Sequence, residues 1–222
     1  MSICLFDLDG TLTDSYRGIA NGWIYALEPL GMTIDSETIK PLLGPPLRQI
    51  IKEIYNFSDE VMEKTINRYR EYYSAKGMYE NEVYRGIPET LSFLKEKGIL
   101  LGVATNKTKE YAEKILEYFK IDGYFAYVSG DMPDGRFTRD GGKREIIKIA
   151  LENLGAIDPD GQKKAVMIGD RKQDIMGARE AGIDSIGVTW GYGTHDELKE
   201  AGATWIVDST EELCRFIVAN LL

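Results

Sequence analysis

Histidine and cysteine are scarce in this chain, which limits the chemistry that it can perform. Its 222 residues include one histidine and two cysteines, Cys4 and Cys214. A single histidine excludes a histidine-rich transition-metal site. Each cysteine lies within an apolar run, so we expect two buried free thiols and no disulfide.

Excess positive charge and long apolar stretches are also missing. Lys and Arg number 27 against 36 Asp and Glu, a formal net charge of −9. Binding to nucleic acid or to an anionic membrane surface needs a basic face, so neither partner is expected. No segment approaches about 18 consecutive apolar residues, and no basic stretch precedes an apolar run at the N-terminus. We therefore expect a cytoplasmic protein.

The composition, 43% hydrophobic and 28% charged, is ordinary for a globular protein. Along the chain, a block with helical spacing of apolar residues is followed by a block of alternating strands and helices. A short apolar strand at 3–6 comes first. Apolar residues then recur at helical spacing in segments 17–30, 46–54 and 59–75. This first block therefore predicts a helical region without strands.

From about residue 83, short apolar strands alternate with helical segments. The predicted strands are 99–105, 124–128, 165–168, 185–188 and 205–207, and the predicted helices are 88–97, 107–119, 143–154, 174–181 and 211–222. This alternation predicts an α/β fold with a mostly parallel sheet, and continuous apolar strands are typical of sheets covered on both faces. We predict an α/β core, residues 1–14 and 85–222, with a helical insertion at 15–84 after the first strand.

Polar side chains follow three of the predicted strands. They are Asp7 and Asp9 after the first strand, Thr105, Asn106 and Lys107 after residues 99–104, and Asp170 and Asp174 after the strand at 165–168; Lys143 opens a helix behind two glycines. Ligands of open α/β sheets bind outside the carboxyl ends of the strands. We therefore expect these groups to converge on one edge of the sheet.

The spacing of Asp7 and Asp9 indicates a cation or a shared proton. Residues i and i+2 at a strand end project to the same side, where two carboxylates repel unless a cation lies between them or one is protonated. Mg²⁺ prefers oxygen ligands and also accepts phosphate oxygens. A site that includes Asp7, Asp9 and Asp170 would suit it.

Each motif alone also has a plainer interpretation. The run LDGTL fits an Asp-Gly turn, Thr105 and Asn106 fit helix caps, and Lys143 fits a solvated lysine. Asp170 and Asp174 fit a turn and a helix surface. A calcium loop is disfavoured, because its glycine and glutamate are not at the required spacing from Asp7. The joint order of the four motifs favours a single site.

These motifs resemble those of a known superfamily. Asp7-Leu8-Asp9-Gly10-Thr11, Ala104-Thr105-Asn106, Lys143 and Gly169-Asp170-Arg171-x-x-Asp174 are similar, in order and strand context, to the four motifs of the haloacid dehalogenase superfamily. The insertion resembles the cap domain of its phosphoglycolate phosphatase-like subgroup, and the run Gly187-Val188-x-x-Gly191-Tyr192-Gly193, followed by Glu197-Leu198, supports that subgroup. The resemblance covers essentially the whole chain and implies a Rossmann-like core with a helical cap.

The resemblance implies a Mg²⁺-dependent phosphomonoester hydrolase of small phosphorylated metabolites, either phosphoglycolate phosphatase-like or 5′-nucleotidase-like, acting through an aspartyl-phosphate. Asp7 would be the nucleophile and Asp9 the acid and base. The phosphoryl group would be bound by Thr105, Lys143, Gly10 and the Asn106 backbone N–H. Mg²⁺ would be held by Asp7, the Asp9 carbonyl and Asp170. Asp174 would bind Mg²⁺ through water or would orient Lys143.

Substrate recognition is assigned to a loop of the insertion. Proline stiffens the run from Gly44 through Pro45 to Arg48, and Arg48 could meet a second anionic group. The alternative is a simple helix start with a solvated arginine. We expect a small phosphorylated metabolite as partner, in a monomer or homodimer.

Other functions remain open at this stage. A β-phosphoglucomutase-type phosphomutase would share the nucleophile pair and the cap position. A phosphonate hydrolase would need a cap lysine, for which Lys52 is available. Haloacid dehalogenation fits Asp9 and Gly10 less well, and a non-catalytic binding protein is disfavoured because every catalytic position is occupied.

Overall fold

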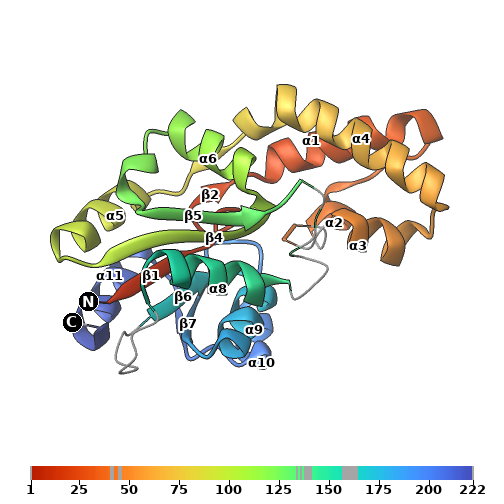
Figure 1. Cartoon of the computed structure of the whole chain (residues 1–222). Helices are drawn as coiled ribbons and strands as arrows, with labels where there is room; N and C mark the ends of the chain where they lie inside the picture. Colours follow the sequence, from red (N-terminus) through yellow and green to blue (C-terminus); the bar gives the residue numbers. More distant parts are fainter. Residues whose placement is uncertain are drawn as a thin grey trace. The chain divides into compact units, whose positions relative to one another are not determined.

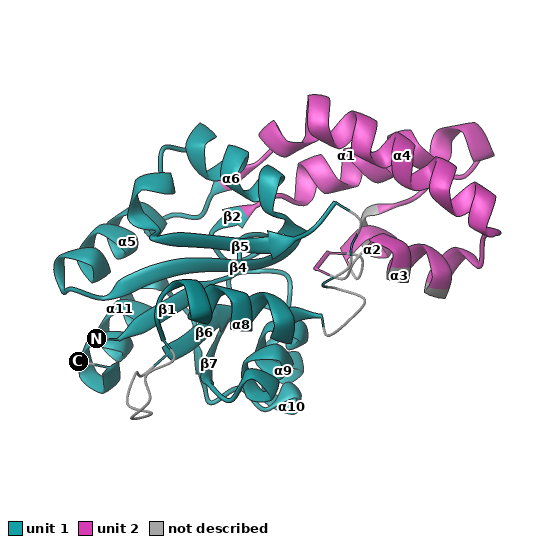
Figure 2. Cartoon of the chain, in the orientation of Figure 1, with its two compact units in different colours: residues 1–13, 83–222 teal, residues 14–82 magenta. Residues whose placement is uncertain are grey.

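The computed structural model describes residues 2–40, 43–44, 47–133, 135, 137, 142–156 and 165–221. The chain divides into two compact units, residues 1–13 with 83–222 and residues 14–82 (Figure 2). The short strands β2 (Thr13–Asp14) and β3 (Glu82–Val83) form a two-stranded sheet where the chain passes between the units.

The larger unit contains a six-stranded sheet with the order β5-β4-β1-β6-β7-β8 (Figure 1). Its strands are β1 (Ile3–Phe6), β4 (Leu100–Thr108), β5 (Tyr127–Asp131), β6 (Ala165–Gly169), β7 (Asp184–Val188) and β8 (Trp205–Val207). All neighbouring strands are parallel. β1 is central and fully buried, with β4 on one side and β6 on the other. The strand order therefore reverses at β1, which makes its carboxyl end a switch point where ligands bind.

Helices cover both faces of this sheet, which explains the unbroken apolar strands (Figure 1). α8 (Lys143–Asn153) and α9 (Lys172–Ala181) pack on the face that presents Ile3, Leu5 and Met167. The other helices of this unit are α5 (Ile87–Glu96) and α6 (Lys109–Tyr118) on the opposite face, α10 (His195–Ala201) against α9, and α11 (Thr210–Leu221) against α5. The α/β class with a mostly parallel sheet is confirmed.

The smaller unit is helical. Its elements are α1 (Tyr16–Leu27), a 3₁₀ turn (Glu28–Leu30), α2 (Ser36–Ile39), α3 (Leu47–Ile50), a π-helical turn (Ile51–Tyr55), α4 (Asp59–Ala75) and a second 3₁₀ turn (Gly77–Tyr79). α1 and α4 pack along each other, with the Trp23 ring tilted against that of Tyr69 at 5.5 Å between ring centroids. Because Tyr69 and Tyr73 of α4 are buried, these tyrosines contribute to the packing between the helices.

Several sequence predictions were wrong at element boundaries. β5 begins at Tyr127, because Asp122–Tyr124 forms a 3₁₀ turn. β4 continues to Thr108, so α6 begins at Lys109 and not at Lys107. The short helix α10 was not predicted.

Both cysteines are free, and Cys4 is buried as predicted, whereas Cys214 is only half-buried. Within the described parts of the chain, no helix combines the length and the apolarity that crossing a membrane requires.

Candidate active site

Asp7 and Lys143 meet at the carboxyl end of β1. The Asp7 N–H donates to the Ile168 carbonyl at 2.9 Å, which fixes Asp7 at the end of the sheet. Lys143, the first residue of α8, places its Nζ 2.8 Å from Asp7 Oδ1 and 2.6 Å from Asp174 Oδ1. All three side chains are buried. The structure thus brings together three residues that the sequence predicted to converge.

Asp170 and Asp174 complete an acidic cluster with Asp7. One carboxylate oxygen from each of these residues lies within 4.8 Å of the others. Asp170 Oδ1 accepts from the Thr11 hydroxyl at 3.0 Å, and Oδ2 accepts from the Tyr192 N–H at 2.8 Å. A carboxylate oxygen has two lone pairs, so these hydrogen bonds leave room for a metal ion.

Asp174 has both oxygens engaged. Oδ1 contacts Lys143, and Oδ2 accepts from the Arg171 backbone N–H at 3.1 Å. This pattern favours the predicted alternative in which Asp174 orients Lys143.

Asp9 contacts Lys107, for which the sequence predicted no catalytic or binding role. Lys107 Nζ lies 2.9 Å from Asp9 Oδ2, and the two side chains are 9% and 14% exposed. Lys107 was predicted to lie in a helix, whereas it lies in β4. Its place directly after Thr105 and Asn106, at a strand end, was a signal for this edge of the sheet but not for the contact with Asp9.

The charges of the site are incompletely balanced. Each carboxylate of the first motif has its own lysine, Lys143 for Asp7 and Lys107 for Asp9. These lysines relieve the repulsion that the sequence analysis assigned to a cation or a proton. Together with Asp170 and Asp174, however, four carboxylates face two ammonium groups. With all four carboxylates ionised, two negative charges remain, which a divalent cation would neutralise.

Burial and the neighbouring charges shift the pKa values of the groups in this site. Burial raises the pKa of Asp7 to about 6, against the opposing effect of the Lys143 ammonium. Burial, with Asp174 and Asp7 nearby, raises the pKa of Asp170 well above its usual range. Burial alone would lower the pKa of Lys143, but Asp174 and Asp7 raise it, so Lys143 stays an ammonium group.

Thr105 and Asn106 lie in β4, so their interpretation as caps of the next helix is wrong; Thr108 precedes α6. Thr105 is buried, and its hydroxyl oxygen accepts from the Lys107 N–H at 3.3 Å. Because that oxygen acts as acceptor, the hydroxyl proton can be donated to a phosphoryl oxygen.

Glycines enclose the Asp170 carboxylate. Gly10 has φ +85°, and a Cβ there would lie 2.3 Å from Asp170 Oδ2. A Cβ at Gly193 would lie 1.9 Å from the Asp170 carbonyl oxygen, and one at Gly191 would lie 2.2 Å from the Gly10 carbonyl oxygen. The glycine run after β7 thus allows its backbone to close on Asp170, with the Tyr192 N–H as donor.

We expect Gly193→Ala to destabilise the larger unit, because its new methyl group meets backbone atoms that cannot swing away. Overpacking of this kind costs about 1–3 kcal/mol, or about 3–10 °C in Tm. Gly123→Ala is the matched control, because nothing lies within 4 Å of a Cβ at Gly123. Thermal unfolding followed by circular dichroism makes the comparison, and equal Tm values for the two variants would contradict the close approach.

The predicted specificity loop is partly described. Gly44 has φ +101°, and Pro45 lies outside the described residues. Arg48 lies in α3 and forms an ion pair with Glu63 of α4, with side chains 39% and 46% exposed. Arg48 is thus already paired within its own unit, and its contact with substrate remains a prediction.

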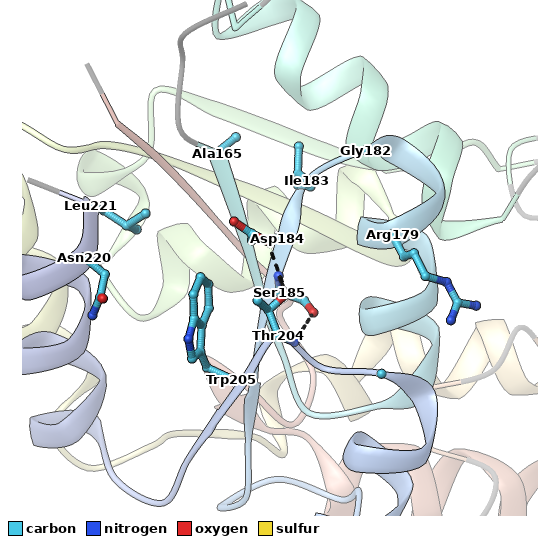
Figure 3. A pocket seen from close by; sticks show the side chains of 11 residues that line it. Ala165, Arg179, Gly182, Ile183, Asp184, Ser185, Thr204, Trp205, Asn220 and Leu221 are labelled. Carbon is cyan, nitrogen blue, oxygen red and sulfur yellow. Dashed lines mark hydrogen bonds between the residues drawn. The ribbon is translucent and has the colours of Figure 1, made fainter.

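A cavity of about 600 Å³ lies at the amino-terminal ends of β6, β7 and β8, at the other edge of the sheet from Asp7 (Figure 3). The Ser185 N–H donates to Thr204 Oγ1 at 3.0 Å, and the Thr204 N–H donates to Ser185 Oγ at 3.3 Å. The two residues thus fulfil each other's hydrogen-bonding needs and connect β7 with the residue before β8. The cavity is remote from the carboxyl ends of the strands, and we do not assign the reaction to it.

The parallel sheet and the lysine-paired carboxylates at its carboxyl edge define an α/β enzyme with an acidic centre. Residues 4–188 match the haloacid dehalogenase-like hydrolase family. A solved structure described as a predicted phosphatase from Clostridium acetobutylicum has 43% sequence identity and a TM-score of 0.89, with 98% of each chain covered. The chain therefore belongs to the haloacid dehalogenase-like hydrolase family, as its four motifs indicated.

Three curated proteins illustrate the range of related activities. A 5′-nucleotidase from Pseudomonas aeruginosa is 39% identical over 196 residues, 88% of this chain and 86% of that protein. The tyrosine-protein kinase PtkA from Mycobacterium tuberculosis is 36% identical over 203 residues, 91% of this chain and 67% of that protein. A phosphoglycolate phosphatase from Aquifex aeolicus is 31% identical over 193 residues, 86% of each.

Proposed function

We propose that this protein is a Mg²⁺-dependent phosphomonoester hydrolase that acts through an aspartyl-phosphate. The observation that carries the proposal is the position of Asp7. Its carboxylate lies at the central strand end, 2.8 Å from a buried ammonium group, in a cluster with uncompensated negative charge. Such a site suits a carboxylate nucleophile and an incoming phosphoryl group.

In the first half-reaction, a carboxylate oxygen of Asp7 attacks phosphorus and the ester P–O bond breaks. Protonated Asp9 gives its proton to the departing oxygen, so the alcohol leaves neutral. Lys143 and the Thr105 hydroxyl hold the phosphoryl oxygens in line for this displacement. The products are the free alcohol, the aspartyl-phosphate and ionised Asp9.

In the second half-reaction, ionised Asp9 takes a proton from water as the water oxygen attacks phosphorus. The bond between phosphorus and Asp7 breaks, inorganic phosphate leaves, and Asp9 is protonated again. The net reaction consumes one ester and one water and yields one alcohol and one phosphate. Both carboxylates return to their starting state.

The residues present fit a hard divalent cation. Asp7, Asp170 and the Asp9 backbone carbonyl would hold Mg²⁺, and all are oxygen donors. When bound, Mg²⁺ supplies positive charge against the phosphoryl oxygens and the acidic cluster. The two unbalanced negative charges of the site favour this ion over a site without metal.

The substrate class is a small phosphorylated metabolite, and the similarity to a 5′-nucleotidase favours a nucleoside 5′-monophosphate. The similarity to a phosphoglycolate phosphatase supports phosphoglycolate as the alternative. The acidic composition supports a partner that is neither nucleic acid nor membrane.

The test is phosphate release from a panel of monoesters with and without Mg²⁺. The panel contains nucleoside 5′-monophosphates, phosphoglycolate and hexose phosphates, with a tyrosine phosphopeptide as an added arm. We expect phosphate release that depends on Mg²⁺ and is fastest from nucleoside 5′-monophosphates. Conversion of one hexose phosphate to another without free phosphate would instead establish a phosphomutase. Release from no ester would contradict the proposal.

A further inference from the structure

We propose that Lys107 is a positioning residue for Asp9, holding the carboxyl group at the place where it exchanges a proton with the departing oxygen. The inference rests on the proposed function, because Asp9 has this task only during phosphoryl transfer. Lys107 is distinct from Lys143, which contacts Asp7 and Asp174.

The contact between Lys107 and Asp9 is specific and sheltered from water. Nζ lies 2.9 Å from Oδ2, and both side chains are more than four-fifths buried. The other carboxyl oxygen, Asp9 Oδ1, is buried without a hydrogen-bond partner among the residues that the structure describes. One oxygen is therefore anchored, and the other is left to meet a group that is not part of the protein.

An irregularity in β4 places Lys107 beside Asp9. Thr105 pairs with Gly130 of β5, and the next pair is Thr108 with Asp131. Asn106 and Lys107 thus form a bulge with no opposing residues. Bulges redirect side chains and are common beside active sites.

Gly130 makes room for this bulge. A Cβ at Gly130 would lie 2.6 Å from the Lys107 carbonyl oxygen and 2.7 Å from the Lys109 nitrogen. These contacts are with backbone atoms, so a side chain at Gly130 would displace the segment that carries Lys107. The position of Lys107 therefore depends on a residue that touches no part of the acidic cluster.

Lys107 differs from the lysines that form surface ion pairs in this unit. Lys114 pairs with Glu110 one helical turn away, and its side chain is 45% exposed. A surface pair of this kind contributes little. Lys107 instead reaches from β4 to Asp9, three residues beyond the end of β1, and is almost enclosed, while its N–H donates to Thr105 Oγ1. One residue thus links the second motif to Asp9.

The experiment compares two substrates of the purified full chain with Mg²⁺. One is the best alkyl ester of the panel, whose departing oxygen needs a proton, and the other is 4-nitrophenyl phosphate, whose leaving group does not. The measured quantity is kcat/KM, which covers the steps up to departure of the leaving group. We expect Lys107→Met to lower kcat/KM at least about tenfold on the alkyl ester and less than about threefold on 4-nitrophenyl phosphate.

Three further variants complete the test. Lys107→Arg keeps a cation for Asp9 and should recover most of the loss on the alkyl ester. Gly130→Ala keeps Lys107 but displaces its backbone, so it should reproduce the same selective loss even where Lys107→Met folds poorly. Lys114→Met removes an exposed lysine and should behave like the wild type on both esters.

The outcomes separate this inference from the proposed function. Equal losses on the two esters, or a Lys107→Met variant indistinguishable from Lys114→Met, would overturn the role of Lys107 while the hydrolase proposal stands. A wild type that releases phosphate from neither ester would overturn the proposed function and the role of Lys107 with it.

Discussion

Replacing Asp7 with asparagine is expected to abolish phosphate release while the fold is retained. The amide cannot attack phosphorus, and loss of a catalytic nucleophile reduces turnover by more than about 10⁴-fold. Lys143 keeps its contact with Asp174 at 2.6 Å, so the buried ammonium group is not left unpaired. The measurement is phosphate release by Asp7→Asn on the best substrate of the panel.

The stability of Asp7→Asn also has an expected direction. The folded-state pKa of Asp7 is about 6, above its ordinary value of 3.8. The native state therefore binds more protons than the unfolded state between about pH 4 and 6, and wild-type stability falls as pH rises through this window. A neutral amide removes this loss, so Tm at pH 7 should be unchanged or higher.

Asp196→Asn is the matched control for charge, because its side chain is 92% exposed. It should retain wild-type turnover. Retention of more than about a hundredth of the rate by Asp7→Asn would exclude Asp7 as nucleophile. Chemical trapping gives a second check, since an acyl phosphate on wild type should be cleaved by hydroxylamine, and Asp7→Asn should yield none.

The main features of the site were predictable because they depend on short-range patterns. A four-residue apolar run that ends in two carboxylates indicates a central strand with a polar end. Further polar groups after other strands then meet at one edge, since parallel strands share a direction. The sequence predicted that Asp7, Asp170 and Asp174 converge with Lys143, which opens a helix, and the structure places these four side chains together.

Lys107 could not be assigned in the same way. Its position depends on a bulge, and the bulge depends on the absence of a side chain at Gly130 on the next strand. A local pattern shows only a polar run that suits a helix start. For the same reason, the sequence indicated only a cation or a proton between Asp7 and Asp9, and not the separate lysine that pairs with each of them.

The glycine run after β7 illustrates a second limit. The sequence shows Gly191 and Gly193 around Tyr192 but not what they approach. In the structure, the backbone here closes on Asp170, with the Tyr192 N–H donating at 2.8 Å. Close approach between segments far apart in the chain is a tertiary property, which no local spacing encodes.

The unbalanced charge of the acidic cluster predicts that Mg²⁺ stabilises the protein. Binding to the native state alone adds about 2.7 kcal/mol at a hundredfold excess over Kd, or about 5–10 °C in Tm for a chain of this size. The carboxylates of Asp7 and Asp170 must be ionised to bind the ion. The pKa of Asp7, about 6, opposes this at lower pH, and the raised pKa of Asp170 opposes it as well. The rise in Tm should therefore be larger at pH 7.5 than at pH 5.

Thermal unfolding with EDTA and then with added Mg²⁺ measures this effect without reference to any substrate. Asp170→Asn should remove most of the response, because Asp170 is fully buried and belongs to the acidic cluster, whereas Asp196→Asn should keep it. Asp170→Asn also turns an N–H toward one of the two donors that bind Asp170, so its response to Mg²⁺ is measured against its own Tm in EDTA. An equal Mg²⁺ response in all three proteins would mean that the ion binds elsewhere, and the assignment of Asp170 as a ligand would then fail even where turnover depends on Mg²⁺.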